Sequence, residues 1–295
     1  MGSALPNPPL LKWSGYMTVL ELFAQKVKNN PKSIVYPEGD NPVILKAAAR
    51  LLSEGLAKPV LLGEPEKINL VAQELEIDLS DLRVIDIQSS DLLEGYISAY
   101  CTARNMPPRI GQRLMDQPLY FGAMMVKQGQ ADCMVAGINH PTEEVIMVSE
   151  LIIGLQSDIS VVSSFFLMQI PDYGGGENGL LVFADPAVNP EPDPQQLADI
   201  AVTTARSIKN LMGWQPRVAL LSFSTRGSAN HPAVEKVSQA LALAQAKDPT
   251  LLVDGEMQAD AALVPAVAHK KVGEGSPVAG KANILIFPDL NAANI

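Results

Sequence analysis

The sequence predicts an α/β protein of two three-layer α/β/α domains, each with a mostly parallel sheet between helices. Its 295 residues are nearly twice the roughly 150 that are typical of one domain. Short β-branched runs alternate with longer amphipathic runs, and the alternation starts again after residue 155. We therefore expect a first domain over 17–155, a second over 156–295, a cleft between them, and a leader over 1–16 outside the fold.

The first domain alternates strands and helices. Residues 42–54 carry apolar side chains at helical spacing, and Gly55 then supplies the left-handed C-cap that ends such a helix before a new strand. This order of strand, helix and strand favours parallel pairing, because the helix carries the chain back to the same edge of the sheet. The expected strands cover 33–36, 59–62, 83–87 and 132–136.

The second domain repeats this alternation from Ser160 onward. Residues 174–179 match the GxGxxG pattern of dinucleotide sites, but a strand follows them where such a site needs a helix. A hairpin between antiparallel strands is the preferred interpretation. The expected strands are 161–170, 180–184, 218–221, 251–253 and 284–287, and the expected helices are 193–211, 232–246 and 259–268.

Composition excludes several classes of protein. Hydrophobic residues make up 47% of the chain, and a formal net charge of −10 argues against nucleic acid as a partner. No run approaches the roughly 18 apolar residues of a membrane span, so we expect no membrane partner. Cys101 and Cys133 lack the spacing of a disulfide framework or a zinc site, which favours a reducing, cytoplasmic setting and no bound metal.

Residues 222–232 are the most informative stretch. They follow one predicted strand and precede a helix that begins at Pro232, which places hydroxyl groups and Arg226 at the carboxyl edge of a parallel sheet. One interpretation is a capped turn. The other is a contact with phosphate or an acyl phosphate, and we favour it because three hydroxyls and an arginine exceed what capping needs.

Residues 137–144 likewise follow a strand and begin a helix. Asn139, His140 and Thr142 are therefore candidates for substrate binding at a second helix N-terminus. His140 is either an acid or hydrogen-bond donor, or a satisfied loop residue, and the sequence does not decide between these. Glu143 and Glu144 are more simply explained as partners of the helix dipole.

Residues 275–282 resemble a phosphate-binding P-loop without completing it. The last position holds Ala282 in place of a hydroxyl, and a strand follows, so either an anion site that includes Lys281 or a plain loop is possible. The acidic run 254–260 has no histidine nearby, and we expect it to pair with Arg226 or Lys281 rather than bind a metal.

Five segments occur in the order found in a known family: 119–126, 162–168, 220–228, 253–261 and 276–290. With them, the chain from about residue 18 to its last residue closely resembles the phosphate acetyltransferases. The resemblance implies a fold like that of isocitrate and isopropylmalate dehydrogenases. It also implies transfer of an acetyl or short acyl group between coenzyme A and phosphate, with acetyl phosphate as the other partner. The remaining implications are a homodimer, coenzyme A as a substrate, and no permanently bound cofactor.

The resemblance also implies roles for residues. Arg104 lies where the family places an arginine of the site, and Ser224 and Thr225 would act in catalysis beside it. The rest of the phosphate pocket would be Arg226, Gly227 and Ser228, with Ser276, Lys281 and Asn283 opposite.

Two departures favour other functions. Met147 stands where the family usually has an arginine, and members usually continue beyond the point matching Ile295 with a Ser-Arg pair and an aspartate. The alternative is therefore a catalytically impaired module that binds coenzyme A or phosphate, or regulates in response to them. A nicotinamide-dependent dehydrogenase ranks last, because no carboxylate triad for magnesium occurs.

Overall fold

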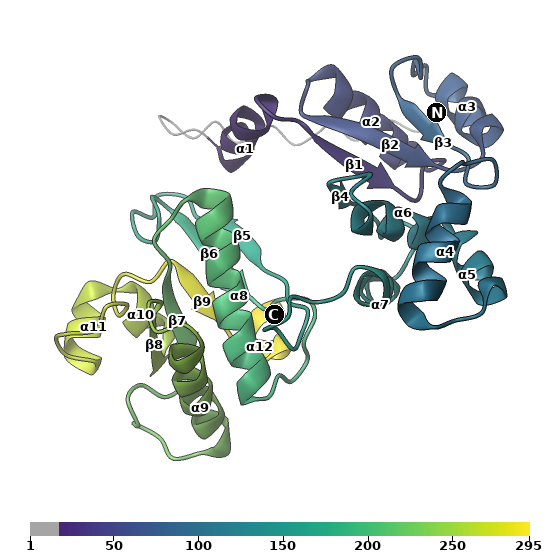
Figure 1. Ribbon diagram of the computed structural model, residues 1–295. Helices are drawn as coiled ribbons and strands as arrows, with labels where there is room; N and C mark the ends of the chain where they lie inside the picture. The colour runs from purple at the N-terminus through teal and green to yellow at the C-terminus, as the bar shows by residue number, and fades with distance from the viewer. Residues whose placement is uncertain (1–17) are drawn as a thin grey trace. The chain divides into compact units, whose positions relative to one another are not determined.

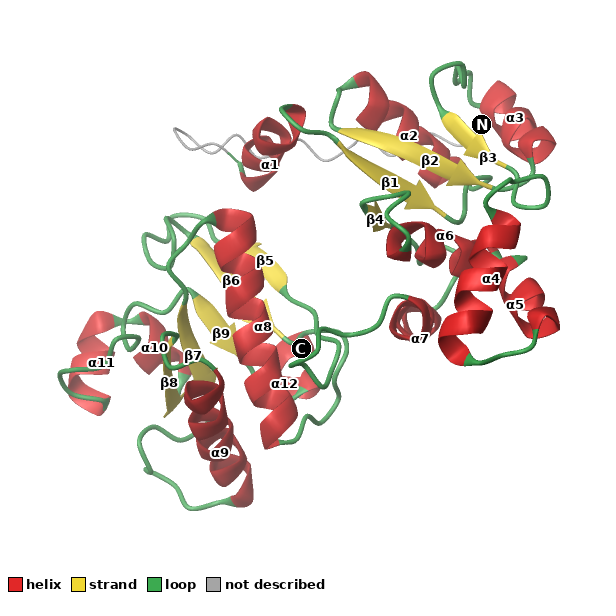
Figure 2. Cartoon of the chain, viewed as in Figure 1, coloured by secondary structure: helices red, strands yellow, loops and turns green. Residues whose placement is uncertain are grey.

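The computed structural model describes residues 18–295, so the expected leader over 1–16 lies outside the described residues. The chain divides between Gly154 and Leu155 into two compact units, which we call unit 1 and unit 2. Each unit has its own sheet with helices packed against it (Figure 1; Figure 2). Among residues 18–295, no helix combines the length and the apolar character that crossing a bilayer requires.

Unit 1 contains a four-stranded, fully parallel sheet with the strand order β3-β2-β1-β4. Its helix α2 begins at Pro42 behind the N-cap Asn41, and Gly55 adopts φ +66° after its end, as the sequence predicted. The elements are α1 (Val19–Lys28), β1 (Lys32–Tyr36), α2 (Pro42–Ser53), β2 (Ala57–Leu62), α3 (Pro65–Glu74), β3 (Arg83–Ile85), α4 (Leu93–Arg104), α5 (Pro108–Met115), α6 (Pro118–Lys127), β4 (Cys133–Met134) and α7 (Thr142–Ile152).

Both faces of this sheet are covered. Val35 of β1 and Leu62 of β2 belong to a core formed with α4, α6 and α7, whereas Tyr36 and Leu61 belong to a second core formed with α2 and α3. Successive side chains of a strand point to opposite faces, so both faces must bury apolar groups when helices lie on each side. The strands are accordingly apolar at consecutive positions.

Unit 2 contains a five-stranded sheet with the order β5-β6-β9-β7-β8, parallel except for β5, which pairs antiparallel with β6. The glycine-rich residues 174–179 connect these two strands, so the predicted hairpin is confirmed. The elements are β5 (Phe166–Gln169), β6 (Leu180–Ala184), α8 (Pro194–Met212), β7 (Arg217–Leu221), α9 (Pro232–Lys247), β8 (Leu252–Met257), α10 (Ala259–Leu263), α11 (Pro265–Lys271), β9 (Ile284–Ile286) and α12 (Leu290–Asn294).

Helix α8 runs along this sheet beside α9, and α10 packs on the core that contains Ala219 and Leu285 (Figure 1). The expected class, an α/β protein with mostly parallel sheets, is confirmed. Five predicted elements differ clearly from the structure. In unit 1, the strand expected over 132–136 covers only Cys133–Met134, and the strand expected over 83–87 covers only Arg83–Ile85. The strand expected over 161–170 covers only Phe166–Gln169, because Ser164 bonds the buried carboxylate of Asp185 instead of a strand.

The other two differences lie in the last third of the chain. The strand expected over 251–253 extends to Met257, so Asp254 and Glu256 lie inside it and not after it. The helix expected over 259–268 is two helices, because Pro265 cannot continue the first and begins the second instead.

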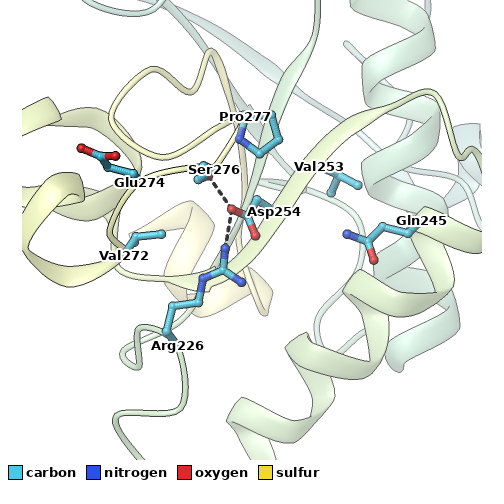
Figure 3. A pocket seen from close by; sticks show the side chains of 9 residues that line it. Arg226, Gln245, Val253, Asp254, Val272, Glu274, Ser276 and Pro277 are labelled. Carbon is cyan, nitrogen blue, oxygen red and sulfur yellow. Dashed lines mark hydrogen bonds and ion pairs between the residues drawn. The ribbon is translucent and has the colours of Figure 1, made fainter.

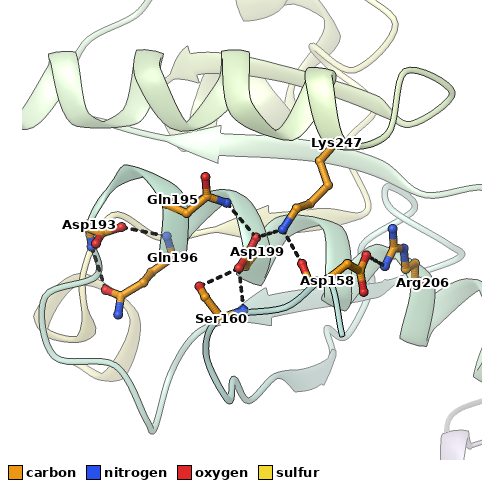
Figure 4. A network of polar contacts seen from close by, with 8 residues as sticks. All are labelled: Asp158, Ser160, Asp193, Gln195, Gln196, Asp199, Arg206 and Lys247. Atoms are coloured by element: carbon orange, nitrogen blue, oxygen red, sulfur yellow. Dashed lines mark hydrogen bonds and ion pairs between the residues drawn. The ribbon is translucent and has the colours of Figure 1, made fainter. Parts of the chain in front are cut away.

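A buried polar network fixes the first residues of unit 2 to its helices (Figure 4). Asp199 of α8, 1% exposed, accepts hydrogen bonds from the amide of Ser160 at 2.8 Å and from its hydroxyl at 2.7 Å. Lys247 of α9 forms an ion pair with the same carboxylate and donates to the carbonyl of Asp158 at 2.6 Å. The network thus joins α8, α9 and the segment before β5.

Candidate functional site

The loop over 222–231 connects β7 to α9 at the carboxyl edge of the unit 2 sheet. It leaves β7 with the amide of Ser222 bonded to the carbonyl of Met257 at 3.0 Å. His231 caps α9 by accepting a hydrogen bond from Ala233, and Pro232 is the first helical residue. The predicted position of this loop, between a strand and a helix N-terminus, is confirmed.

The hydroxyl groups of this loop form bonds within unit 2. Ser224 is fully buried, and its Oγ donates to Glu256 Oε1 at 2.8 Å. Ser228 Oγ accepts from the Thr225 amide at 3.0 Å, and Thr225 Oγ1 accepts from the Gln258 amide at 3.0 Å. All three hydroxyls therefore help to hold the loop in shape, and the expected contact of this loop with phosphate stays a prediction.

Glu256 is the anion that this loop surrounds. Its Oε1 also accepts from the Gly227 amide at 2.7 Å, and its Oε2 accepts from the Ser238 hydroxyl at 3.3 Å. Burial raises the pKa of Glu256, but the bonds from Gly227 and Ser224 outweigh it and leave the pKa below its ordinary value. The carboxylate therefore stays charged inside the loop.

Arg226 is held in an unusual backbone conformation. Its φ is +52°, a left-handed value that costs a residue with a side chain roughly 1–2 kcal/mol. The amide of Arg226 donates to the carbonyl of Glu256 at 3.1 Å, and its guanidinium Nη2 lies 2.7 Å from Oδ2 of Asp254. A strained residue persists where its surroundings determine it, which is typical of functional sites.

The Arg226–Asp254 pair lines a polar cavity of about 450 Å³ (Figure 3). Asp254 is 5% exposed and also accepts a hydrogen bond from the hydroxyl of Ser276. The expected pairing of the acidic run with Arg226 is confirmed, whereas Asp260 pairs with Lys271 at 2.8 Å and not with Lys281. The lining residues are Arg226, Gln245, Val253, Asp254, Val272, Glu274, Gly275, Ser276 and Pro277.

Lys281 and Asn283 lie elsewhere on the sheet. Both come just before β9, so they fall at the amino edge of the parallel strands, away from the loop that follows β7. Asn283 is fully buried; its Oδ1 accepts from the Arg217 amide at 2.7 Å and its Nδ2 donates to Glu177 at 2.8 Å. The expectation that Lys281 and Asn283 lie opposite Arg226 is therefore wrong. Ser276, which was expected with them, does lie near Arg226, because both side chains bond Asp254.

In unit 1, Asn139, His140 and Thr142 lie where the chain passes from β4 into α7. Asn139 is exposed, and its Oδ1 accepts from the side chain of Asn41 at 3.2 Å. His140 Nδ1 lies 3.0 Å from Glu144 Oε2, and Thr142 is the exposed first residue of α7. The structure thus places these three candidates on one short segment.

Glu38 holds that segment, and the sequence analysis did not identify it. It follows β1, is 4% exposed, and accepts three backbone N–H groups: Asn139 at 2.6 Å, Gly137 at 3.2 Å and His140 at 3.2 Å. The signal available in the sequence was a charged residue between Pro37 and Gly39 directly after an apolar strand.

Arg104, the arginine that the resemblance indicated, ends α4 in unit 1. Its guanidinium donates to the carbonyl of Leu151 in the last turn of α7, and Lys127 Nζ donates to the carbonyl of the C-cap residue Ile153 at 2.7 Å. Two cations therefore stabilise the negative end of the α7 dipole. Arg104 is itself exposed, in unit 1, whereas Ser224 and Thr225 are in unit 2.

Within residues 18–295, no group of three or more His, Cys, Asp or Glu side chains is arranged to hold a metal ion. Both cysteines are free; Cys101 is buried and Cys133 is exposed.

Comparison with known proteins gives concordant matches. The chain fits the sequence profile of the phosphate acetyl/butaryl transferases over residues 18–295. It is 44% identical to a phosphate acetyltransferase of Thermoanaerobacterium thermosaccharolyticum, over 95% of this chain and 85% of the relative. It is 41% identical to a phosphate acetyltransferase of Acetivibrio thermocellus, over 95% of this chain and 84% of the relative.

Solved structures agree. A phosphotransacetylase from Streptococcus pyogenes matches with a TM-score of 0.87 and 36% identity, covering 94% of this chain and 84% of that one. A phosphotransacetylase from Staphylococcus aureus matches with a TM-score of 0.86 and 36% identity, covering 93% of this chain and 83% of that one.

Proposed function

Because the chain belongs to the phosphate acetyl/butaryl transferase family, we propose that it is a phosphate acetyltransferase, exchanging an acetyl group between coenzyme A and inorganic phosphate. The observation that carries this proposal is similarity to phosphate acetyltransferases along nearly the whole chain. The structure adds a guanidinium, Arg226, aimed by a buried carboxylate beside a polar cavity. The substrates are acetyl coenzyme A and phosphate in one direction, and acetyl phosphate and coenzyme A in the other.

The reaction is an acyl transfer. In the direction that forms acetyl coenzyme A, the thiolate attacks the carbonyl carbon of acetyl phosphate, a C–S bond forms, and the C–O bond to phosphate breaks. The electron pair leaves with phosphate, so the site must stabilise negative charge on oxygen, which positioned N–H donors do well in a site that excludes water.

Arg226 is our candidate for holding the phosphate. A guanidinium has five N–H groups in a planar fork that fits phosphate oxygens. Among residues 18–295, only its Nη2 is bound to a side chain, that of Asp254, so this pair aims the group without occupying all its donors. Ser224, Thr225, Gly227 and Ser228 support Arg226 by shaping its loop, and Ser276 acts through Asp254.

Arg104, Asn139, His140 and Thr142 are our candidates in unit 1. The exposed Asn139 and Thr142 offer hydrogen bonds to a substrate, and His140 is oriented by Glu144. Arg104 is exposed and carries a second positive charge. We further propose a homodimer that acts in the cytoplasm without a resident metal or cofactor; free cysteines support a reducing setting, and light scattering at twice the chain mass would support the dimer.

The test is release of free thiol from acetyl coenzyme A when phosphate is added. We expect thiol release with the wild type, and about a hundredfold lower kcat/KM for phosphate with Arg226→Gln. Arg206→Gln is the matched control, because Arg206 is a half-buried arginine of α8 in the same unit, where it pairs with Asp158 of the segment before β5. Absence of thiol release above the blank, even at high protein concentration, would reject the activity.

A second candidate function is a weakly catalytic module that binds coenzyme A or phosphate. Met147 favours it, because its side chain is 50% exposed on α7 at the position where the resemblance indicates an arginine. Calorimetric binding of coenzyme A without turnover would support this function. Gain of turnover in Met147→Arg would then show that the wild type lacks turnover because it lacks a cation at this position.

A further inference from the structure

Glu38 lies at the point of unit 1 where open α/β sheets bind ligands. The strand order β3-β2-β1-β4 reverses direction at β1, because β2 and β3 lie on one side of it and β4 on the other. Ligands bind outside the carboxyl ends of the strands at such a switch point. Glu38 follows the carboxyl end of β1, and the segment over 137–140 follows that of β4.

The sheet itself does not hold this segment. Strand β4 has only two residues, and the last backbone bond of this pairing joins the Val135 amide to Val35 O at 3.1 Å. Beyond this bond, the Glu38 carboxylate holds the chain by accepting hydrogen bonds from the amides of Gly137, Asn139 and His140. Glu38 therefore holds the backbone of the segment, and Asn41 adds one hydrogen bond to the side chain of Asn139 at 3.2 Å.

No cation shares this carboxylate. Among residues 18–295, Glu38 forms no ion pair with Lys or Arg, so the three N–H dipoles alone stabilise it. A buried charge satisfied only by backbone donors is costly to keep, and natural chains keep such charges where they fix a geometry. Gly39 helps to place it, since the Gly39 amide bonds Leu62 O at 3.1 Å.

The surface that the segment presents is partly apolar and carries no Lys or Arg. Ile138 is 44% exposed and Asn139 is exposed. The ionisable residues of the two segments over 37–41 and 137–144 are acidic, apart from His140, and they include no Lys or Arg. A phosphate dianion is repelled by such surroundings, whereas an uncharged chain that carries amide groups can pack on Ile138 and bond to Asn139.

We propose that Glu38 is a positioning residue that shapes the segment over 137–140 to bind the neutral, amide-bearing arm of coenzyme A. This proposal rests on the proposed function, which supplies coenzyme A as the substrate. It gives Glu38 a role in affinity for coenzyme A and none in affinity for phosphate.

The experiment measures coenzyme A binding by calorimetry and amide hydrogen exchange of residues 135–141 by mass spectrometry. Glu38→Gln keeps the size of the side chain but replaces one acceptor oxygen with an NH₂ group, which faces N–H donors. We expect about a tenfold higher Kd for coenzyme A, about tenfold faster exchange of this segment, and an unchanged KM for phosphate. Glu38→Asp retains the carboxylate and should recover part of the affinity.

Glu66→Gln is the control, because Glu66 is an exposed residue of α3 in the same unit. An unchanged Kd in Glu38→Gln, or an equal rise in the KM for phosphate, would overturn the proposal. Wild-type protein that binds coenzyme A without turnover rejects the proposed function alone, and the Kd values still decide the role of Glu38. Wild-type protein that does not bind coenzyme A overturns both.

Discussion

Arg226 and Asp254 form an ion pair in which guanidinium Nη2 lies 2.7 Å from carboxylate Oδ2, and the two side chains are 43% and 7% exposed. The carboxylate lies inside strand β8, whereas the arginine projects from the loop after β7. The side chain of Arg226 is flexible. Because Asp254 is fixed in strand β8, the ion pair holds the guanidinium in one orientation.

Removing the charge of Asp254 should loosen Arg226. In Asp254→Asn, the ion pair is lost and the hydroxyl of Ser276 loses a charged acceptor, so we expect the KM for phosphate to rise about tenfold and stability to fall by about 1–3 kcal/mol. Steady-state kinetics and urea unfolding measure the two effects. Ser276→Ala retains the ion pair and should change only stability; an equal rise in KM would show that Arg226 is not aimed by its charge partner.

Glu256 should make stability depend on pH. Burial raises its pKa, but hydrogen bonds from the Gly227 amide and the Ser224 hydroxyl lower it below the ordinary value overall. A carboxyl with a lowered folded-state pKa adds stability above its unfolded pKa of about 4.3, and that stability is lost as the pH falls through the folded pKa. Glu256→Gln should therefore lose more stability at pH 7 than at pH 3.

Urea unfolding at both pH values tests this expectation. Glu256→Asp keeps a titrating carboxylate and should keep a pH dependence like that of the wild type. If the difference in unfolding free energy between wild type and Glu256→Gln is the same at pH 3 and pH 7, the loop hydrogen bonds do not stabilise the charged form.

Breaking the buried ion pair of unit 2 should destabilise the protein (Figure 4). Lys247→Met leaves the Asp199 carboxylate, 1% exposed, without its cation, and removes the bond to Asp158 O. We expect a loss of about 3 kcal/mol in the free energy of unfolding. Lys209→Met, an exposed lysine of α8, should change stability by less than about 0.5 kcal/mol. Similar losses in both variants would mean that the pair contributes nothing.

Two glycines of unit 1 should respond in opposite directions to alanine. A Cβ at Gly39 would lie 2.6 Å from Leu62 O, so Gly39→Ala must move the backbone beside Glu38 and should cost about 1–3 kcal/mol. Gly95 lies in helix α4 with nothing within 4 Å of a Cβ, so Gly95→Ala should stabilise by about 0.5–1 kcal/mol. Thermal unfolding compares the two variants, and an unchanged stability of Gly39→Ala would contradict the close approach of the residues after β1 to Leu62 of β2.

Several features of this protein follow from local sequence. Pro42 and Gly55 bracket α2, and Pro194 and Gly213 bracket α8, because proline and glycine restrict or free the backbone wherever they occur. The alternation of strands and helices then predicts parallel sheets, and it correctly puts the Arg226 loop at a strand end. Opposite charges also predicted the pairing of Arg226 with the acidic run.

Tertiary structure decided which groups meet. Glu38 and Asn139 are far apart in the sequence, and only the pairing of β1 with β4 brings them within 2.6 Å. Likewise, the pairing of β9 with β7 decides that Asn283 meets Arg217, whose amide donates to its Oδ1 at 2.7 Å. Periodicity and turn residues report on neighbours along the chain, whereas strand order depends on how whole faces of helices and strands bury their apolar area against one another.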